Sequence, residues 1–177
     1  MEANGIIPDI IDTKPKALLE VNYPSGVKVD LGKELTPTQV KDQPTVTWKA
    51  ESDALYTLAM VDPDAPSRAE PTSREILHWL VINIPANKVA EGQTVAEYVG
   101  SGAPQGTGLH RYVFLVFKQP AKIDTTKFIP KTSREGRLKV KTRDYIAKYN
   151  LGEPVAGNFY QAQYDDYVPI LRAQFTE

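Results

Sequence analysis

Two histidines and a pair of aspartates are the side chains of this sequence best suited to chemistry. His78 lies within an apolar run, and His110 follows directly after a glycine-rich segment. Asp62 and Asp64 flank a proline at the end of another apolar run. Each also has an ordinary explanation, because a histidine in a strand is commonly a core residue and Asp-Pro sequences commonly form turns. The functional interpretation is that a rigid loop holds Asp62 at the lip of a pocket.

The spacing of these residues argues against several kinds of site. A metal site is weakly indicated, since the sequence contains neither His-x-His nor His-Glu-x-x-His. A serine hydrolase would use Ser73 or Ser101 with a histidine, but no Gly-x-Ser-x-Gly motif is present. Asp62 and Asp64 are too close in sequence to flank a sugar as glycosidase carboxylates. A dinucleotide site is excluded because the glycine-rich segment contains Pro104 and leads into a strand.

The remaining interpretation is a pocket that binds an anion. Glycine-rich turns expose successive backbone N–H groups, which bind phosphate oxygens. Imidazoles near this segment would add donors that become cationic near about pH 6.5. Asp62 would then orient an imidazole or bind the ammonium group of a ligand. This combination favours a zwitterionic or monoanionic headgroup over a polyphosphate, which the aspartate would repel.

Composition and charge exclude several classes of protein. The 177-residue chain is 41% hydrophobic and 24% charged, as expected for one folded domain over residues 1–177. A net charge of −1 gives no general attraction to nucleic acids or anionic membranes. The absence of cysteine excludes disulfides, thiol catalysis and iron–sulfur clusters, and favours a reducing cytoplasm. The first residues lack the regions of a signal peptide, and no apolar run approaches the roughly 20 residues of a membrane span.

Alternating and apolar segments predict a mainly β fold, and 14 prolines disfavour long helices. Residues 76–84 and 112–117 are apolar on both faces, which is typical of central strands covered on both sides. Alternation places His78 on the same face as Ile76, Leu80 and Ile82. We therefore expect two packed sheets, a β-sandwich, with short peripheral helices. The predicted strands are 17–23, 27–31, 45–48, 55–61, 76–84, 112–118 and 158–164, and the predicted helices are 142–149 and 167–175.

Charge is unevenly distributed along the chain. Residues 118–148 contain ten basic and three acidic side chains, whereas residues 51–75 contain six acidic and two basic ones. The basic stretch is expected to be a solvated surface, with a protein-docking or membrane-surface patch as the alternative. Thr142 lies in this stretch at a predicted helix N-cap, where it is either a plain cap or a phosphorylation site.

Three ordered motifs carry a family resemblance. They are LYTLAMVDPDAPSR at 55–68, EILHWLVIN at 75–83 and GTGLHRYVF at 106–114. Together with VAGNFYQA at 155–162, they closely resemble the phosphatidylethanolamine-binding protein family, which includes the animal Raf kinase inhibitor proteins and plant flowering regulators. The resemblance covers the chain from about residue 17 to its end. It implies a β-sandwich-like fold with a small pocket that is closed by a C-terminal helix.

The resemblance also implies a ligand site and a range of partners. The family's ligands include phosphoethanolamine and nucleotides, and its roles include inhibition of kinases or serine proteases. Ser73 and Arg172 stand where animal relatives commonly have pocket tyrosines, and Ala103 stands where many have a second proline. These departures bear on ligand preference. Matched position by position, the anion pocket would be lined by Asp62, Ala65, Pro66, His78, Gly102, Pro104 and His110, with Asp64 in the same rigid loop.

The leading hypothesis is a non-enzymatic, cytoplasmic, monomeric binding protein without a cofactor or metal. It would bind a phosphate-containing small molecule or phospholipid headgroup and a protein kinase or serine protease, with peripheral membrane contact but no nucleic acid. The alternative is a hydrolase of phosphate or ester bonds that uses His78 or His110 as base. Against it, no cysteine exists and no serine lies on a recognisable activating turn. The proline-rich loop is also expected to contain a cis peptide bond, with Ala65–Pro66 favoured.

Overall fold

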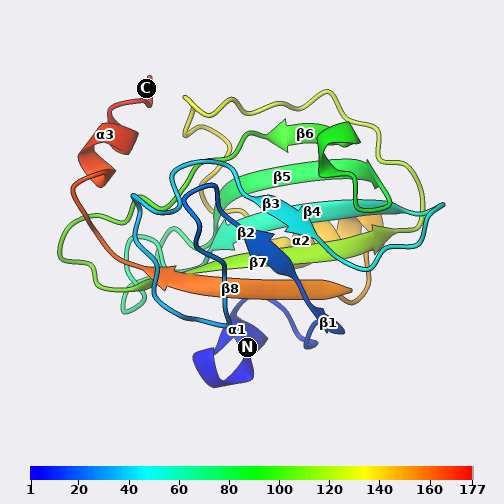
Figure 1. The fold of residues 1–177 in the computed structure, drawn as a ribbon, viewed down its shortest axis with the longest axis horizontal. Helices are drawn as coiled ribbons and strands as arrows, with labels where there is room; N and C mark the ends of the chain where they lie inside the picture. Colours follow the sequence, from blue (N-terminus) through cyan, green and yellow to red (C-terminus); the bar gives the residue numbers. More distant parts are fainter. Residues whose placement is uncertain (177) are drawn as a thin grey trace.

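The structure is a computed structural model that describes residues 1–176 (Figure 1). Most of its regular structure is β-strand, and its helices are short. In chain order the elements are the 3-10 helix η1 (Glu2–Asn4), α1 (Ile6–Asp9), β1 (Ala17–Leu18), β2 (Glu20–Asn22), β3 (Thr45–Thr47), β4 (Leu55–Asp62), β5 (Ile76–Pro85), the 3-10 helix η2 (Val89–Glu91), β6 (Gln93–Ala96), β7 (His110–Gln119), α2 (Thr142–Tyr149), β8 (Ala156–Ala162) and α3 (Val168–Arg172).

The strands of the described chain form two sheets. A six-stranded sheet has the order β1-β8-β7-β4-β5-β6, and β2 pairs with β3 in a two-stranded sheet (Figure 1). Neighbours in the large sheet are antiparallel except β1, which lies parallel to β8. Strand β4 therefore lies between two long antiparallel partners, β5 and β7. The predicted mainly β fold with a C-terminal helix is confirmed.

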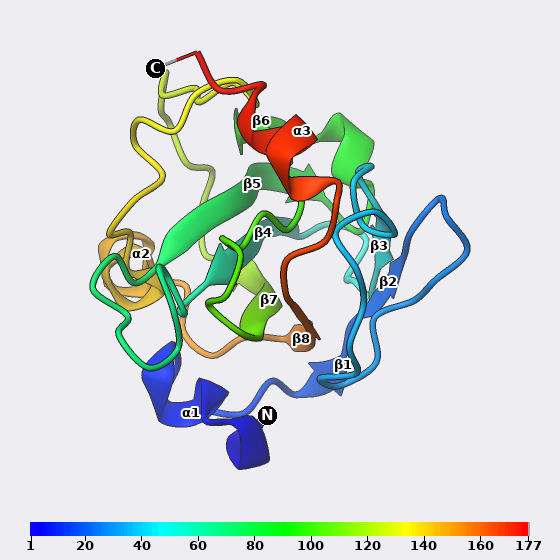
Figure 2. The same ribbon diagram turned by 90° about the vertical axis from the view of Figure 1, so that its left-hand side faces the viewer.

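The large sheet is covered on both faces. On one face, Trp79 and Tyr112 pack in a cluster that includes Val46 of the small sheet. On the other face, Leu80 packs in a cluster that Ile146 of α2 joins from outside. Figure 2 shows α2 on one side of the large sheet and β2 and β3 on the other. This double cover explains why β4 and β7 are buried along almost their whole length.

Most predicted elements are present with shifted boundaries. The predicted helices at 142–149 and 167–175 appear as α2 and as the shorter α3. The predicted strand at 17–23 is divided into β1 and β2. Strand β6 is not predicted, because its four residues are too few to show a clear alternation. The cis peptide bond predicted at Ala65–Pro66 is present.

The predicted strand at 27–31 is wrong. Lys28 forms an isolated bridge with Asn22, but the segment does not extend into a ladder. Its end is set by Leu31 and Gly32, whose φ angles of 40° and 93° lie in the left-handed region. Such conformations turn the chain away from an extended path.

The predicted N-cap at Thr142 is also wrong. Lys141 is the N-cap of α2, and Thr142 is the first helical residue and is buried. Its hydroxyl and its backbone N–H donate to Glu75 Oε1 at 2.6 and 3.2 Å. Burial raises the pKa of Glu75, and the hydrogen bonds from Thr142 oppose that rise. A phosphate on Thr142 would meet this buried carboxyl group, so the geometry argues against the phosphorylation hypothesis.

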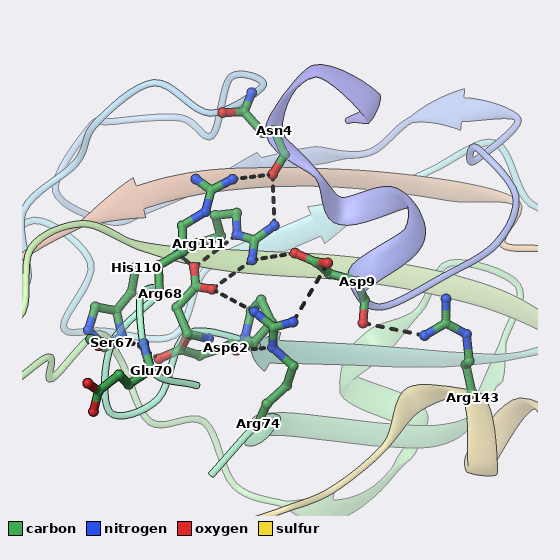
Figure 3. A network of polar contacts seen from close by, with 12 residues as sticks. Asn4, Asp9, Asp62, Ser67, Arg68, Glu70, Arg74, His110, Arg111 and Arg143 are labelled. Atoms are coloured by element: carbon green, nitrogen blue, oxygen red, sulfur yellow. Dashed lines mark hydrogen bonds and ion pairs between the residues drawn. The ribbon is translucent and has the colours of Figure 1, made fainter. Parts of the chain in front are cut away.

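A buried ion pair joins the loop after β4 to the beginning of β7 (Figure 3). Asp64 and Arg111 are both 0% exposed. The Arg111 guanidinium donates to both Asp64 oxygens at 2.9 and 2.7 Å, and its backbone N–H donates at 2.9 Å. Burial acts to raise the pKa of Asp64, but these hydrogen bonds bring it below its usual value. Arg111 also binds Asp9 Oδ2 at 2.8 Å and the Asn4 carbonyl at 2.7 Å, which attaches the N-terminal segment.

Replacement of Arg111 by methionine should test the role of this pair. Arg111→Met leaves a buried carboxylate without its main partner, so we expect a loss of about 3–5 kcal/mol in unfolding free energy at pH 7. Because the folded pKa of Asp64 is depressed, its contribution is complete above its unfolded pKa and disappears as pH falls through the folded pKa. The loss should therefore shrink below about pH 4 in urea unfolding curves.

Two further variants control this experiment. Asp64→Asn/Arg111→Met should recover part of the stability, because no charge then remains buried without a partner. Arg143→Met removes a more exposed arginine that pairs with Asp12 at the surface, and should leave stability nearly unchanged. An Arg111→Met loss no greater than that of Arg143→Met would contradict the assigned role.

Candidate functional site

Three neighbouring strands bring the predicted site residues to one edge of the large sheet. Asp62 is the last residue of β4, and His110 is the first residue of β7. His78 lies near the beginning of β5, whose first residue, Ile76, pairs with Asp62. Because β4 is antiparallel to both neighbours, its end meets the beginnings of β5 and β7. Residues far apart in the sequence therefore meet at this edge.

His78 occupies a β-bulge, so the face predicted for it is wrong. The pairs that flank it are Met60 with Trp79 and Val61 with Leu77. In the pairing of β4 with β5, His78 is therefore an extra residue without a partner. Leu80 and Ile82 pack in the cluster beneath α2, whereas the His78 ring contacts Tyr112 on the opposite face. The bulge resets the alternation and turns the imidazole toward the sheet edge.

The residues at this edge line a cavity of about 220 Å³. Ser73, Ala103 and Arg172, the positions that depart from the family pattern, line it as well. Asp64 is not among the described lining residues, because its carboxylate is paired with Arg111 away from the cavity. Ligand binding by Asp64 stays a prediction, and the structure shows this residue holding the loop through Arg111. The predicted residues that do line the cavity are Asp62, Ala65, Pro66, His78, Gly102, Pro104 and His110.

His110 is held by hydrogen bonds on both sides of its ring. Its Nδ1 lies 2.9 Å from Asp62 Oδ2, and its Nε2 lies 3.0 Å from Thr107 Oγ1. A carboxylate partner favours the ring form that carries a proton on Nδ1. The other Asp62 oxygen accepts the backbone N–H of Asp64 at 2.7 Å. The loop therefore fixes Asp62, and Asp62 in turn orients His110.

His78 has the ring nitrogen that is most available to a ligand. Its Nδ1 lies 2.8 Å from the carbonyl oxygen of Val99, which can only accept, so Nδ1 carries the proton. In the neutral ring, Nε2 then bears a lone pair, and it makes no hydrogen bond to another of the described residues. Burial lowers the pKa of His78, although the Asp62 carboxylate partly opposes this. An anion at Nε2 would consequently bind together with a proton.

Tyr112 lies between the two histidines. Its ring stacks on His110 with centroids 6.2 Å apart and meets His78 edge-on at 5.3 Å. Tyr112 is not among the site residues predicted from the sequence, although strand alternation places it on the same face as His110. The other lining residues that the sequence analysis does not select are apolar, glycine or basic and come from distant segments: Ile76, Leu77, Val99, Gly100, Arg134, Arg137, Leu138, Leu171 and Phe175.

Helix α3 closes one side of the cavity by packing directly on the glycine-rich segment. A Cβ atom at Gly102 would lie 2.9 Å from Leu171 Cδ2, which is closer than real Cβ contacts allow. Arg172 also donates to the Gly102 carbonyl through Nε at 3.0 Å and Nη2 at 2.8 Å. Glycine at position 102 therefore permits the close approach of the helix.

The arrangement favours anion binding over covalent chemistry. Among residues 1–176, no group of three or more histidine, aspartate or glutamate side chains is placed to hold a metal ion. Thr107 contacts His110 but donates its hydroxyl to the Pro104 carbonyl at 2.8 Å, and it is outside the described cavity lining. Ser101 is buried and shares a hydrogen bond with the Tyr160 hydroxyl. Neither hydroxyl is presented to the cavity as a nucleophile.

Comparisons with known proteins agree with this geometry. The solution structure of CG7054 is 52% identical, covers 97% of this chain and 98% of its own, and has a TM-score of 0.81. Carboxypeptidase Y inhibitor, in a crystal structure with its cognate proteinase, is 28% identical over 93% of each chain, with a TM-score of 0.78. A 26 kDa secreted antigen of Toxocara canis is 42% identical over 91% of this chain, which spans 62% of that relative's length.

A protein-family model matches residues 25–161, which include the strands and loops that build the cavity. The description of that model is phosphatidylethanolamine-binding protein. The chain therefore belongs to the phosphatidylethanolamine-binding protein family.

Proposed function

We propose that the protein is a non-enzymatic receptor for a phosphate-bearing headgroup such as phosphoethanolamine. The proposal is based on His78, whose Nε2 makes no hydrogen bond to another described residue. This imidazole lines the same cavity as the Asp62–His110 pair. The cavity volume of about 220 Å³ lies below the roughly 300–1,000 Å³ of sites for drug-sized ligands, which suits a headgroup. A nucleotide would place its phosphate in the cavity and leave its nucleoside outside.

We also propose a protein partner, either a serine protease or a signalling kinase. The protease is supported by the relative that was solved as an inhibitor with its cognate proteinase. The kinase is supported by the resemblance to Raf kinase inhibitor proteins. The segment between β7 and α2 would provide a docking surface for an acidic partner. Its exposed basic residues include Lys122, Lys127, Lys131, Lys139 and Lys141.

We further propose that the protein is a cytoplasmic monomer and that it contacts membranes peripherally. Support for the cytoplasm comes from the absence of cysteine, which suits a reducing compartment. No helix of the described chain has the length and apolar character needed to cross a bilayer. Because one relative is a secreted antigen, fractionation of cells that express the full chain should compare medium and cytosol. Accumulation in the medium would overturn the proposed location.

A hydrolase is the weaker candidate. Asp62, His110 and Thr107 form a hydrogen-bonded chain in the order acid, base and hydroxyl, as in hydrolase triads. The Thr107 hydroxyl has a single proton, and the Pro104 carbonyl at 2.8 Å competes with His110 Nε2 for it. Since the described cavity lining excludes Thr107, a bound ester would not meet this hydroxyl.

Binding of glycerophosphoethanolamine should strengthen as pH falls from about 8 to 6. Burial lowers the pKa of His78, so the free protein holds it neutral at pH 8, and a bound anion favours its protonated form. The phosphodiester keeps its charge over this range, whereas a phosphomonoester titrates near pH 6. Calorimetry and an NMR titration of both histidines measure these effects.

Two substitutions assign the effect to the imidazole. His78→Ala removes a charge-assisted hydrogen bond of about 1.5–3 kcal/mol, so affinity at pH 6 should fall roughly 10- to 150-fold and lose its pH dependence. Ser73→Ala changes an uncharged residue of the same cavity and should bind nearly as tightly as the unmodified protein. Affinity that is flat with pH, together with unshifted imidazoles, would make the histidines core residues and remove the proposed site.

A panel of chromogenic esters and phosphates should show no turnover by the protein. The reason is that Ser73, the serine that lines the described cavity, makes no hydrogen bond to either histidine and so lacks an activating base. His110→Ala and Thr107→Val are the informative variants. Turnover by the unmodified protein that disappears in both variants would establish the hydrolase instead of the receptor.

A serine carboxypeptidase or a Raf-type kinase should be inhibited by the purified protein. If the basic segment is the docking surface, Lys122→Glu/Lys127→Glu/Lys131→Glu should weaken inhibition and reduce its dependence on salt. The matched control, Lys14→Glu/Lys16→Glu/Lys28→Glu, changes the same charge at exposed sites outside this segment and should inhibit normally. Absence of inhibition in both assays would reject the proposed partners.

A further inference from the structure

The cavity carries more positive than negative charge. Three arginines line it, and among its described lining residues Asp62 is the acidic one. Arg137 is buried and already donates to backbone carbonyls, including those of Leu77 and Glu97. Its guanidinium is therefore committed to holding the chain. Arg172 differs, because it lies on α3 at the rim.

The Arg172 guanidinium is fixed in place, but not all of its N–H donors are used. Its Nε and Nη2 both donate to the Gly102 carbonyl, which holds the guanidinium against the cavity wall. Within residues 1–176, its Nη1 makes no hydrogen bond, so donors remain for a ligand. Burial lowers the pKa of Arg172, and the nearby charge of Arg134 lowers it further. An anion at this position would relieve that repulsion and bind the guanidinium fork in its preferred geometry.

Asp62 is poorly placed to receive an ammonium group by comparison. Its Oδ2 is paired with His110 Nδ1, and its Oδ1 accepts the backbone N–H of Asp64. It is also 4% exposed. The ammonium group of a ligand would thus find Asp62 already occupied, whereas an added carboxylate would find a donor at Arg172.

We propose that the preferred ligand carries a carboxylate beside its phosphate ester, with the phosphate bound at His78 and the carboxylate bound at Arg172. This inference rests on the proposed headgroup receptor and specifies its ligand class. Phosphoserine-type compounds have this chemistry, either as free small molecules or as lipid headgroups. Phosphoethanolamine differs from phosphoserine by the absence of the carboxylate, so the two compounds form a matched pair.

Calorimetry with O-phosphoserine and O-phosphoethanolamine tests the inference directly. The unmodified protein should bind O-phosphoserine at least about 10-fold more tightly, as expected for an added guanidinium–carboxylate interaction. Arg172→Gln should reduce this preference to nearly none and leave the affinity for O-phosphoethanolamine almost unchanged. Arg172→Lys, which keeps the charge but not the fork, should retain an intermediate preference.

The control variant is Arg143→Gln. It removes the same charge from α2, outside the described cavity lining, and should keep the full preference for O-phosphoserine. If Arg172→Gln lowered the affinity for both ligands by the same factor, Arg172 would only support the fold around Gly102. That result would overturn the inference. Equal affinity of the unmodified protein for both ligands would overturn it while leaving the proposed receptor intact. Binding of neither ligand would overturn both.

A second pair of probes identifies the source of the ligand. Glycerophosphoserine and glycerophosphoethanolamine are the phosphodiester counterparts of the first pair and represent lipid headgroups. The same preference among the diesters would support a lipid headgroup. A preference confined to the monoesters would support a free phosphate ester that carries a carboxylate.

Discussion

The buried pair of Asp64 and Arg111 is the constraint on which the rest of the site depends (Figure 3). Two charges can be removed from solvent only when their hydrogen-bonding groups are satisfied, and the bonds between these residues meet most of that requirement. Each member is also close in sequence to a cavity residue, since Asp64 follows Asp62 by two positions and Arg111 follows His110 directly. The pair therefore fixes the loop against β7 on one side, and the Asp62–His110 bond forms on the other.

The chemistry of the site follows from how its polar groups are already satisfied. Asp62 bonds to His110 and to the backbone of its own loop. His78 is bonded through Nδ1, and its Nε2 remains available. A histidine held in this way accepts a proton when an anion approaches, without the need for a neighbouring nucleophile. The same residue types that indicate catalysis in other proteins are therefore consistent here with proton-linked binding, in a family that includes a protease inhibitor.

Much of the fold and part of the site can be predicted from the sequence, for identifiable physical reasons. The central strands are long and apolar, so their pattern is clear, and the motifs around Asp62, His78 and His110 are specific. The bulge cannot be predicted, because an extra residue leaves no mark on composition. The sequence shows that two aspartates share a loop, but not which of them Arg111 binds. Tyr112 contributes through tertiary contacts that local pattern does not reveal. Arg172 is placed at the pocket by the resemblance, but its bonds to Gly102 depend on the packing of α3.

The bulge at His78 has a consequence for how the site can change during evolution. This residue has no cross-strand partner in β4, and its side chain lines the cavity, held there by the Val99 carbonyl and the Tyr112 ring. Substitutions there can alter ligand chemistry while the strand keeps its pairing. Deletion of the extra residue would leave Leu77 and Trp79 adjacent, still opposite Val61 and Met60 and still on opposite faces, so the pairing would survive while the cavity lost the His78 imidazole. The bulge is therefore a requirement of the cavity and not of the sheet, and the site can be lost without loss of the fold.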